Sequence, residues 1–184
     1  MDLLDPLSQT FDHTTTVIAG IRDDQFDAAT PCRDWDVRAL VTHTLGVVVN
    51  MGRGASGTDL LTDVNAVALE ADLGAQFRAE ADRTLAAWTA RGFEGEVNIG
   101  AGPMPVQAGM SINLLDTATH SWDIARATGQ DANLPDALAA TVLAVSRGFV
   151  SDDIRKFAGF DPVVPVGPDA GPTEQLVAFL GRRP

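Results

Sequence analysis

The amino-acid sequence predicts a mainly α-helical protein, built as an up-down four-helix bundle. Apolar residues recur at helical spacing over four long stretches, and glycine and proline gather mainly between those stretches. Apolar residues make up 45% of the chain, which is enough to bury a sizeable core. A length of 184 residues suits one domain, or one domain with a short appendage, and we predict a single domain over residues 1–184.

The predicted helices follow one another along the whole chain. They cover residues 5–23, 37–51, 64–90, 109–128, 136–149 and 173–180. The first has apolar residues near helical spacing. The second is capped by Asp34 or Asp36 and broken by Gly52, Gly54 and Gly57. The third is rich in alanine, which is a strong helix former.

Glycine and proline mark the remaining boundaries. Residues 91–108 carry four glycines and two prolines, which predicts an irregular link with a short hairpin that pairs residues 96–99 with residues 104–107. Gly129 ends the fourth helix, and Pro135 precedes the fifth. Residues 151–172 contain four prolines and form a proline-rich tail before the last short helix.

Charge and composition exclude several classes of function. The net charge is −12, and no cluster of Lys and Arg exceeds two residues, so we expect no nucleic-acid partner and no docking to anionic membranes. No apolar stretch reaches 18 residues, which excludes a transmembrane helix. The acidic N-terminus does not resemble a signal peptide, and the one cysteine forms no intrachain disulfide. We therefore expect a cytoplasmic protein.

A candidate metal site comes from three residues on two predicted helices. Asp116 and His120 stand four residues apart, which places a carboxylate and an imidazole on one helix face, about 6 Å apart along the axis. His43 flanks the apolar face of the second helix and can reach the bundle interior. Two histidines and one carboxylate can hold a divalent metal and leave coordination positions open for chemistry.

Simpler interpretations stay open at this point. A histidine beside an apolar face is more often hydrogen-bonded within the core than bound to metal. The Asp116–His120 spacing arises by chance in solvated helices as well. A stripe of polar residues on the same helix, Asn113, Asp116, His120 and Asp123, nevertheless lies among apolar neighbours, where an unpaired carboxylate would cost several kcal/mol.

Other conspicuous residues are assigned structural roles. Cys32 lies eleven residues before His43, up to ~16 Å away if the chain between them is helical, so we expect a buried, inert cysteine that does not bind the metal. We expect Trp35 and Trp122 to pack in the core. Asp123 and Arg126, one turn apart, are expected to pair.

Three blocks of the sequence resemble a known family. They are TPCRDWDVRALVTH (residues 30–43), NLLDTATHSWDIARATGQ (residues 113–130) and QLVAFLGR (residues 175–182). They resemble the corresponding blocks of actinobacterial DinB-like proteins, which are grouped with the metal-binding N-terminal domain of mycothiol-dependent maleylpyruvate isomerase. The resemblance spans nearly the whole chain.

The resemblance implies a DinB-like bundle with a divalent metal in its core, zinc first and nickel or another transition metal as the alternative. It implies that His43, Asp116 and His120 are the metal ligands. The isomerase pattern has glutamate where this chain has Asp116, so the carboxylate here is one methylene shorter. Related proteins are linked to S-transfer with a low-molecular-weight thiol, which implies a small thiol such as mycothiol as cosubstrate.

Two functional hypotheses follow for the same bundle. The first is a metal-dependent S-transferase or isomerase, in which metal coordination makes the thiol a thiolate that attacks an unidentified electrophile. It requires no protein nucleophile and no further cofactor-binding residue. The second is a non-catalytic metal- or ligand-binding protein, which a fourth protein ligand such as Asp123 or Asn113 would favour. A bundle without metal and a homodimer are left open.

Overall fold

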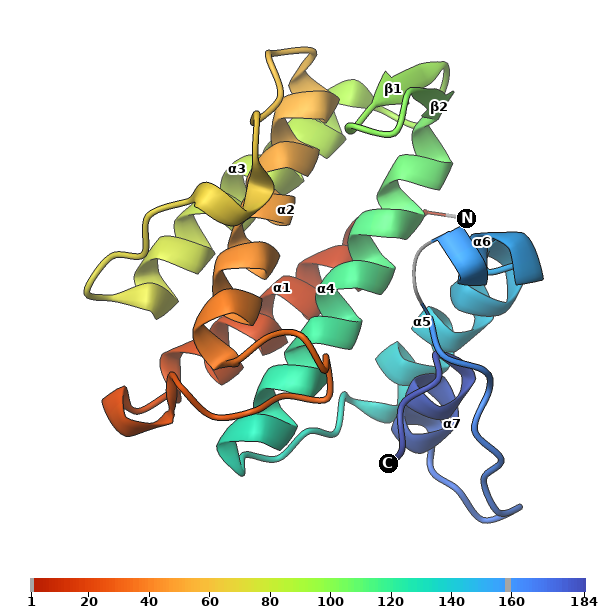
Figure 1. Cartoon of the computed structure of the whole chain (residues 1–184). Coiled ribbons are helices and arrows are strands. Elements are labelled where there is room, and N and C mark those ends of the chain that lie inside the picture. Colours follow the sequence, from red (N-terminus) through yellow and green to blue (C-terminus); the bar gives the residue numbers. More distant parts are fainter. Residues whose placement is uncertain (1, 158–159) are drawn as a thin grey trace. The chain divides into compact units, whose positions relative to one another are not determined.

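The computed structural model describes residues 2–157 and 160–184 (Figure 1), and the predicted mainly α-helical fold is confirmed. The chain forms two compact units, residues 1–132 and residues 133–184. That residues 1–184 act as a single domain stays a prediction. None of the helices in the described part of the chain has the length and hydropathy that a membrane crossing requires.

The first unit is a four-helix bundle with a small hairpin at one end. Its helices are α1 (Leu4–Ala19), α2 (Val37–Ser56), α3 (Leu73–Arg91) and α4 (Val106–Thr128). Short helical turns, η1 (Asp23–Gln25) and η2 (Val64–Ala66), lie in the connections. The antiparallel strands are β1 (Glu96–Asn98) and β2 (Pro103–Pro105). The predicted hairpin is therefore present, with shorter strands.

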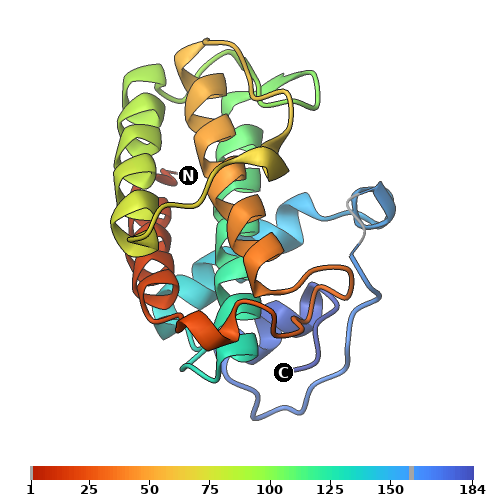
Figure 2. The same ribbon diagram turned by 60° about the vertical axis from the view of Figure 1, so that its left-hand side comes forward.

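The bundle places α2 beside α4, and these are the helices that carry the predicted metal ligands. α1 packs against α3 and α4, and α2 packs against the same two helices. α1 and α4 run in one direction and α2 and α3 in the other (Figure 1, Figure 2). Residues 57–72 return the chain along the bundle before α3 begins. The helices therefore do not alternate strictly, as they would in a simple up-down bundle.

The second helix is longer than predicted. Two of its glycines, which suggest a break in the sequence, instead let neighbouring elements pack closely against the helix. Gly52 and Gly54 lie inside α2, so the prediction that they break it is wrong. An added Cβ at Gly54 would lie 2.5 Å from the backbone oxygen of Asn98, so the hairpin lies directly on the helix. α2 ends at Gly57, whose positive φ of 68° suits glycine.

The third helix is shorter than the predicted span of residues 64–90. It begins at Leu73, where the Asp72 side chain accepts a hydrogen bond from the backbone N–H of Ala75 at 2.9 Å. This N-cap competes with continuation of the helix toward residue 64. The residues before it form η2 and the rest of the return segment.

The second unit contains α5 (Asp136–Phe149), α6 (Asp152–Phe157) and α7 (Pro172–Phe179), and α5 packs against α7. The fifth helix has the predicted bounds. α6 lies in the proline-rich tail, outside the helices that the sequence predicts. Its first turn carries two aspartates that favour a helix N-terminus, and the Ser151 hydroxyl accepts from the backbone N–H of Ile154 at 3.2 Å.

Candidate metal centre

α4 carries a line of polar side chains into the bundle. Asn113 and Asp123 are fully buried, and Asp116 and His120 lie between them on successive turns. Each buried polar group must find a partner, because burial without a hydrogen bond is costly. Asn113 finds it in the core, where its Oδ1 accepts from the indole Nε1 of Trp88 at 3.0 Å. Asn113 is therefore a structural residue of the bundle.

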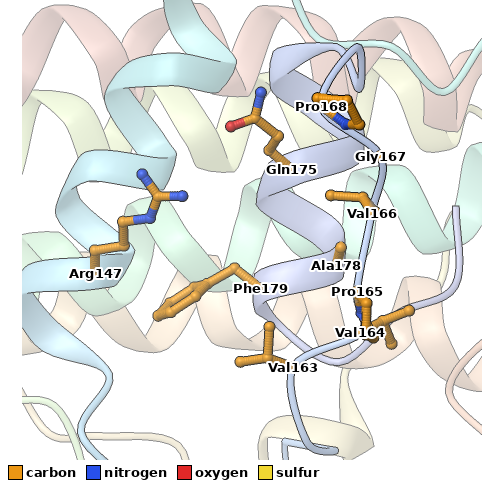
Figure 3. A pocket seen from close by; sticks show the side chains of 10 residues that line it. All are labelled: Arg147, Val163, Val164, Pro165, Val166, Gly167, Pro168, Gln175, Ala178 and Phe179. Atoms are coloured by element: carbon orange, nitrogen blue, oxygen red, sulfur yellow. The ribbon is translucent and has the colours of Figure 1, made fainter.

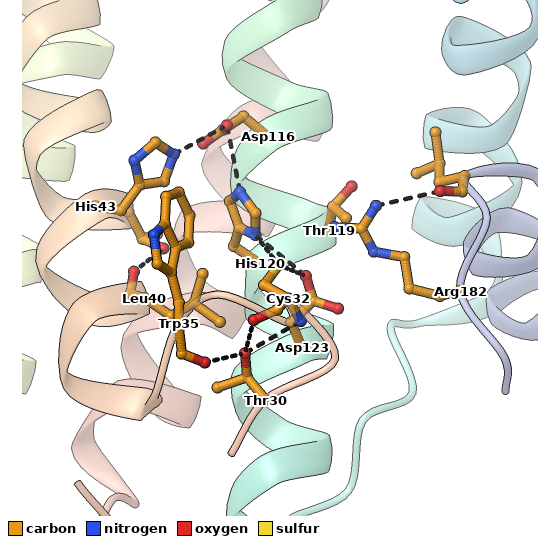
Figure 4. Close-up of polar contacts among 12 residues, drawn as sticks. Thr30, Cys32, Trp35, Leu40, His43, Asp116, Thr119, His120, Asp123 and Arg182 are labelled. Atoms are coloured by element: carbon orange, nitrogen blue, oxygen red, sulfur yellow. Dashed lines mark hydrogen bonds and ion pairs between the residues drawn. The ribbon is translucent and has the colours of Figure 1, made fainter. Parts of the chain in front are cut away.

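The three predicted metal ligands meet between α2 and α4 (Figure 4). The Nε2 atom of His43 lies 3.8 Å from Oδ2 of Asp116, and the Nε2 atom of His120 lies 3.6 Å from the same oxygen. One ligand atom from each of the three residues lies within 4.8 Å of the other two. The sequence-predicted site residues are thus brought together by the fold.

The spacing of these atoms fits a shared metal ion. Distances of 3.6 and 3.8 Å exceed the usual length of a hydrogen bond to oxygen. Two nitrogen or oxygen ligands at about 2.0–2.1 Å from one tetrahedral ion stand about 3.4 Å apart. Each imidazole nitrogen therefore stands slightly farther from the Asp116 oxygen than it would in a metal-bound set, and small side-chain rotations would close this difference.

The ring of His43 is fixed by a hydrogen bond at Nδ1, the nitrogen that faces away from Asp116. Its Nδ1 lies 2.9 Å from Oδ1 of Asn65, an amide oxygen that can only accept, so Nδ1 donates. In the neutral imidazole this leaves a lone pair on Nε2, which faces Asp116. Asn65 reaches the ring because η2 lies against Gly46, where an added Cβ would collide with the Val64 carbonyl.

The charge of Asp116 also affects His43. Burial lowers the pKa of the His43 imidazole, but the adjacent Asp116 carboxylate and the hydrogen bond to Asn65 raise it by more. The pKa of His43 therefore lies above the usual value for histidine.

The site is enclosed but reachable. The exposed fractions of the side chains are 16% for His43, 22% for Asp116 and 11% for His120. Trp35 forms one wall, with its ring centroid 4.4 Å from that of His43 and 6.1 Å from that of His120. Trp35 is half-buried at this site, so its predicted place in the core is corrected. Trp122 is buried, as predicted.

Cys32 and Asp123 lie close to Nδ1 of His120, the ring nitrogen that faces away from Asp116. The separation of up to ~16 Å between Cys32 and His43 applies only to a helical connection, and α2 begins only at Val37. Cys32 Sγ lies 3.2 Å from Asp123 Oδ2 and 3.8 Å from His120 Nδ1, so Cys32 is half-buried and hydrogen-bonded rather than an inert core residue.

The expected pair of Asp123 and Arg126 is also corrected. The carboxylate of Asp123 faces His120 and Cys32, with Oδ2 3.1 Å from the Nδ1 atom of His120. The guanidinium of Arg126 lies over the ring of Trp122, 5.5 Å from its centroid. A cation near an aromatic face is itself a favourable contact.

A separate groove of about 380 Å³ lies in the second unit, beside α7 (Figure 3). It is lined by Arg147, Val163, Val164, Pro165, Val166, Gly167, Pro168, Gln175, Ala178 and Phe179. The lining offers one charged side chain and no metal-ligand side chain. The chemistry that the sequence predicts therefore belongs to the cluster on α2 and α4.

The chain is similar to known proteins in both sequence and fold. Residues 7–125 match the family of the mycothiol maleylpyruvate isomerase N-terminal domain. Uncharacterized proteins from two Mycobacterium tuberculosis strains, CDC 1551 and H37Rv, are each 30% identical over 184 residues, covering 97% of this chain and 98% of the relative. The crystal structure of the mycothiol-dependent maleylpyruvate isomerase shares the fold, with a TM-score of 0.56 and 14% identity over 78% of this chain and 68% of that chain.

Proposed function

This chain belongs to the family of the mycothiol maleylpyruvate isomerase N-terminal domain, and from that membership we propose that it binds a divalent metal and acts as a metal-dependent S-transferase or isomerase with a small thiol. The observation that carries the proposal is the convergence of three ligand atoms. Nε2 of His43 and Nε2 of His120 stand 3.8 and 3.6 Å from one oxygen of Asp116, too far for hydrogen bonds and close to the spacing around one ion.

His43, Asp116 and His120 would hold the metal. Two imidazole nitrogens and one carboxylate oxygen suit zinc best, and nickel or another transition metal can use the same set. Three protein ligands leave a position for an exogenous thiol. When bound, a divalent metal lowers the pKa of a coordinated thiol, so that a thiolate is available at neutral pH. The ring of Trp35 lies beside those of His43 and His120 and would cover one side of the bound metal.

The thiol partner is inferred from the relatives. The solved structure that shares this fold is a mycothiol-dependent maleylpyruvate isomerase, which supports mycothiol or a similar thiol as the cosubstrate. The second reactant is a small electrophile. The carboxylate of Asp116 is one methylene shorter than the glutamate of the isomerase pattern, so we do not assign maleylpyruvate itself. The chemistry requires no protein nucleophile, because the thiol is the nucleophile.

The non-catalytic alternative would be favoured by a fourth protein ligand, and both candidates for that role face elsewhere. Asn113 accepts from Trp88, and Asp123 contacts His120 through Nδ1, the nitrogen that does not face Asp116. The arrangement therefore supports an open site.

We also propose that the protein works in the cytoplasm without nucleic-acid or membrane partners, as its net charge of −12 favours. A homodimer stays open.

The test is a thiol-transfer assay on zinc-loaded protein. Mycothiol and a chromogenic aryl halide are supplied together, and loss of free thiol is followed beside product formation. We expect turnover in the zinc-loaded protein, none after chelation, and recovery when zinc is returned. His120→Ala should stay inactive under all three conditions. Equal turnover before and after complete removal of zinc would overturn the proposed mechanism.

A further inference from the structure

The proposed function gives no role to two residues behind His120. Asp123 has a fully buried side chain, and its Oδ2 lies 3.1 Å from the His120 Nδ1 atom. The same oxygen accepts a hydrogen bond from the Cys32 thiol at 3.2 Å (Figure 4). A carboxylate removed from water is costly unless charge-bearing or hydrogen-bonding groups surround it. The buried Asp123 carboxylate beside Nδ1 of His120 is therefore a candidate for a role in the site.

We propose that Asp123 and Cys32 are positioning residues for His120, an inference that rests on the proposed metal site. Asp123 accepts the Nδ1 proton of His120, which holds the imidazole in the tautomer with a lone pair on Nε2. That lone pair faces Asp116, where the metal would lie. Cys32 donates its thiol proton to the same oxygen of Asp123 and so holds the carboxylate in place.

The loop that carries Cys32 is held firmly enough for this role. The Thr30 hydroxyl donates to the Trp35 carbonyl at 2.8 Å, and the backbone N–H of Cys32 donates to the Thr30 hydroxyl at 3.1 Å. The backbone N–H of Trp35 closes the turn on the Cys32 carbonyl at 2.9 Å. Asp36 then caps α2 by accepting from Ala39 at 2.8 Å. The Cys32 thiol therefore extends from a fixed turn that directly precedes α2, the helix that carries His43.

The same three residues could instead hold a second metal, because their ligand atoms also lie within 4.8 Å of one another. The distances favour the positioning role. The two contacts to Asp123, at 3.1 and 3.2 Å, have hydrogen-bond length and each has an N–H or S–H proton to share. On the opposite side of His120 the gap to Asp116 is 3.6 Å, which a hydrogen bond does not explain.

The first experiment uses metal-free protein, so it does not depend on the proposed function. NMR of the imidazole nitrogens, at a pH of about 8 that lies well above the ordinary histidine pKa, reports which ring nitrogen carries the proton. We expect His120 in the Nδ1–H form in wild type and a mixture of both forms in Asp123→Ala. Ser121→Ala is the matched control, because Ser121 is a buried neighbour on α4 whose hydroxyl has no hydrogen-bond partner among the described residues.

The second experiment measures zinc affinity by competition with a chelator. Asp123→Ala should bind zinc about 10–100-fold more weakly than wild type, as removal of a group behind a ligating histidine typically does. Cys32→Ala should also weaken binding, and Cys32→Ser should restore most of it because the hydroxyl can donate to Asp123. Ser121→Ala should match wild type. If Asp123→Ala does not fold, Asp123→Asn, which keeps an acceptor but no charge, should give an intermediate loss.

The outcomes separate this inference from the proposed function. Wild-type tautomer and affinity in Asp123→Ala would overturn the positioning role, as would equal losses in Cys32→Ser and Cys32→Ala. A second equivalent of cobalt with a thiolate-to-cobalt charge-transfer band would overturn it as well, because Cys32 would then be a ligand. If wild type bound no metal while its His120 tautomer still depended on Asp123, the positioning role would hold and the proposed function would fall.

Discussion

Gly46 allows the η2 turn to lie directly on α2, and Gly46→Ala tests whether this contact sets the geometry of His43. An added Cβ would lie 2.7 Å from the carbonyl carbon of Val64 and closer still to its oxygen. Both distances are below 3.0 Å, the shortest contact that a Cβ atom normally makes. The η2 backbone must then retreat by about 1 Å. The 2.9 Å bond between His43 Nδ1 and Asn65 Oδ1 would pass the limit of a hydrogen bond.

We expect two measurable consequences of Gly46→Ala. Zinc affinity should fall by about 10–100-fold, because His43 loses the group that fixes its ring. Overpacking costs about 1–3 kcal/mol, and alanine returns about 1 kcal/mol through its helix propensity. The free energy of unfolding of the metal-free protein should therefore fall by about 0–2 kcal/mol. Chelator competition measures the first quantity and urea denaturation the second.

Gly54→Ala is the matched control in the same helix. Its added Cβ would meet the Asn98 backbone oxygen at 2.5 Å, on the side of the hairpin rather than of η2. It should destabilise the protein to a similar extent and leave zinc affinity unchanged. If Gly46→Ala bound zinc as tightly as Gly54→Ala, the η2 contact would have no role in positioning His43.

Further predictions concern the ligands themselves. His43→Ala and His120→Ala should each lose most of the zinc affinity yet keep the helical circular dichroism of wild type, because the bundle core supplies the folding energy; loss of the helical signal would refute this separation. Asp116→Glu should retain zinc and Asp116→Ala should not, so equal titrations of wild type and the alanine variant would remove Asp116 from the site. Zinc affinity should fall as the pH drops from about 8 to about 5, because protons compete for the imidazoles, and a flat profile would contradict the two-histidine site. The raised pKa of His43 places the start of this competition above about 6.5. In metal-free protein the same shift means that His43 stabilises the fold below pH about 6.5, and that this contribution is lost as the pH rises through its folded-state pKa.

The parts of the site that were predictable depend on local spacing. Asp116 and His120 are four residues apart in a long helix with clear ends, so helix geometry alone places them on one face. His43 could be placed on a helix flank by its apolar neighbours. Its meeting with Asp116 depends on the packing of α2 against α4, for which helical periodicity gives no register.

The parts that were missed depend on loops and on backbone contacts between elements. Cys32 reaches His120 because residues 30–36 form a turn held by Thr30, whereas the distance estimate assumed a helix. Asn65 lies on η2, whose position depends on the absence of a side chain at Gly46. Glycines inside a helical pattern suggest a break, yet here Gly46 and Gly54 mark places where another backbone lies on the helix. The packing role of such a glycine is visible only once its partner is known.

The central claim is that His43, Asp116 and His120 hold one divalent metal, and metal content tests it most directly. Wild-type protein and Asp116→Ala are purified without a metal-affinity tag, incubated with zinc, freed of excess zinc by gel filtration and examined by elemental analysis. We expect about one equivalent of transition metal per chain in wild type and close to none in the variant. Metal-free wild-type protein after the same treatment, or equal metal content in both proteins, would contradict the claim.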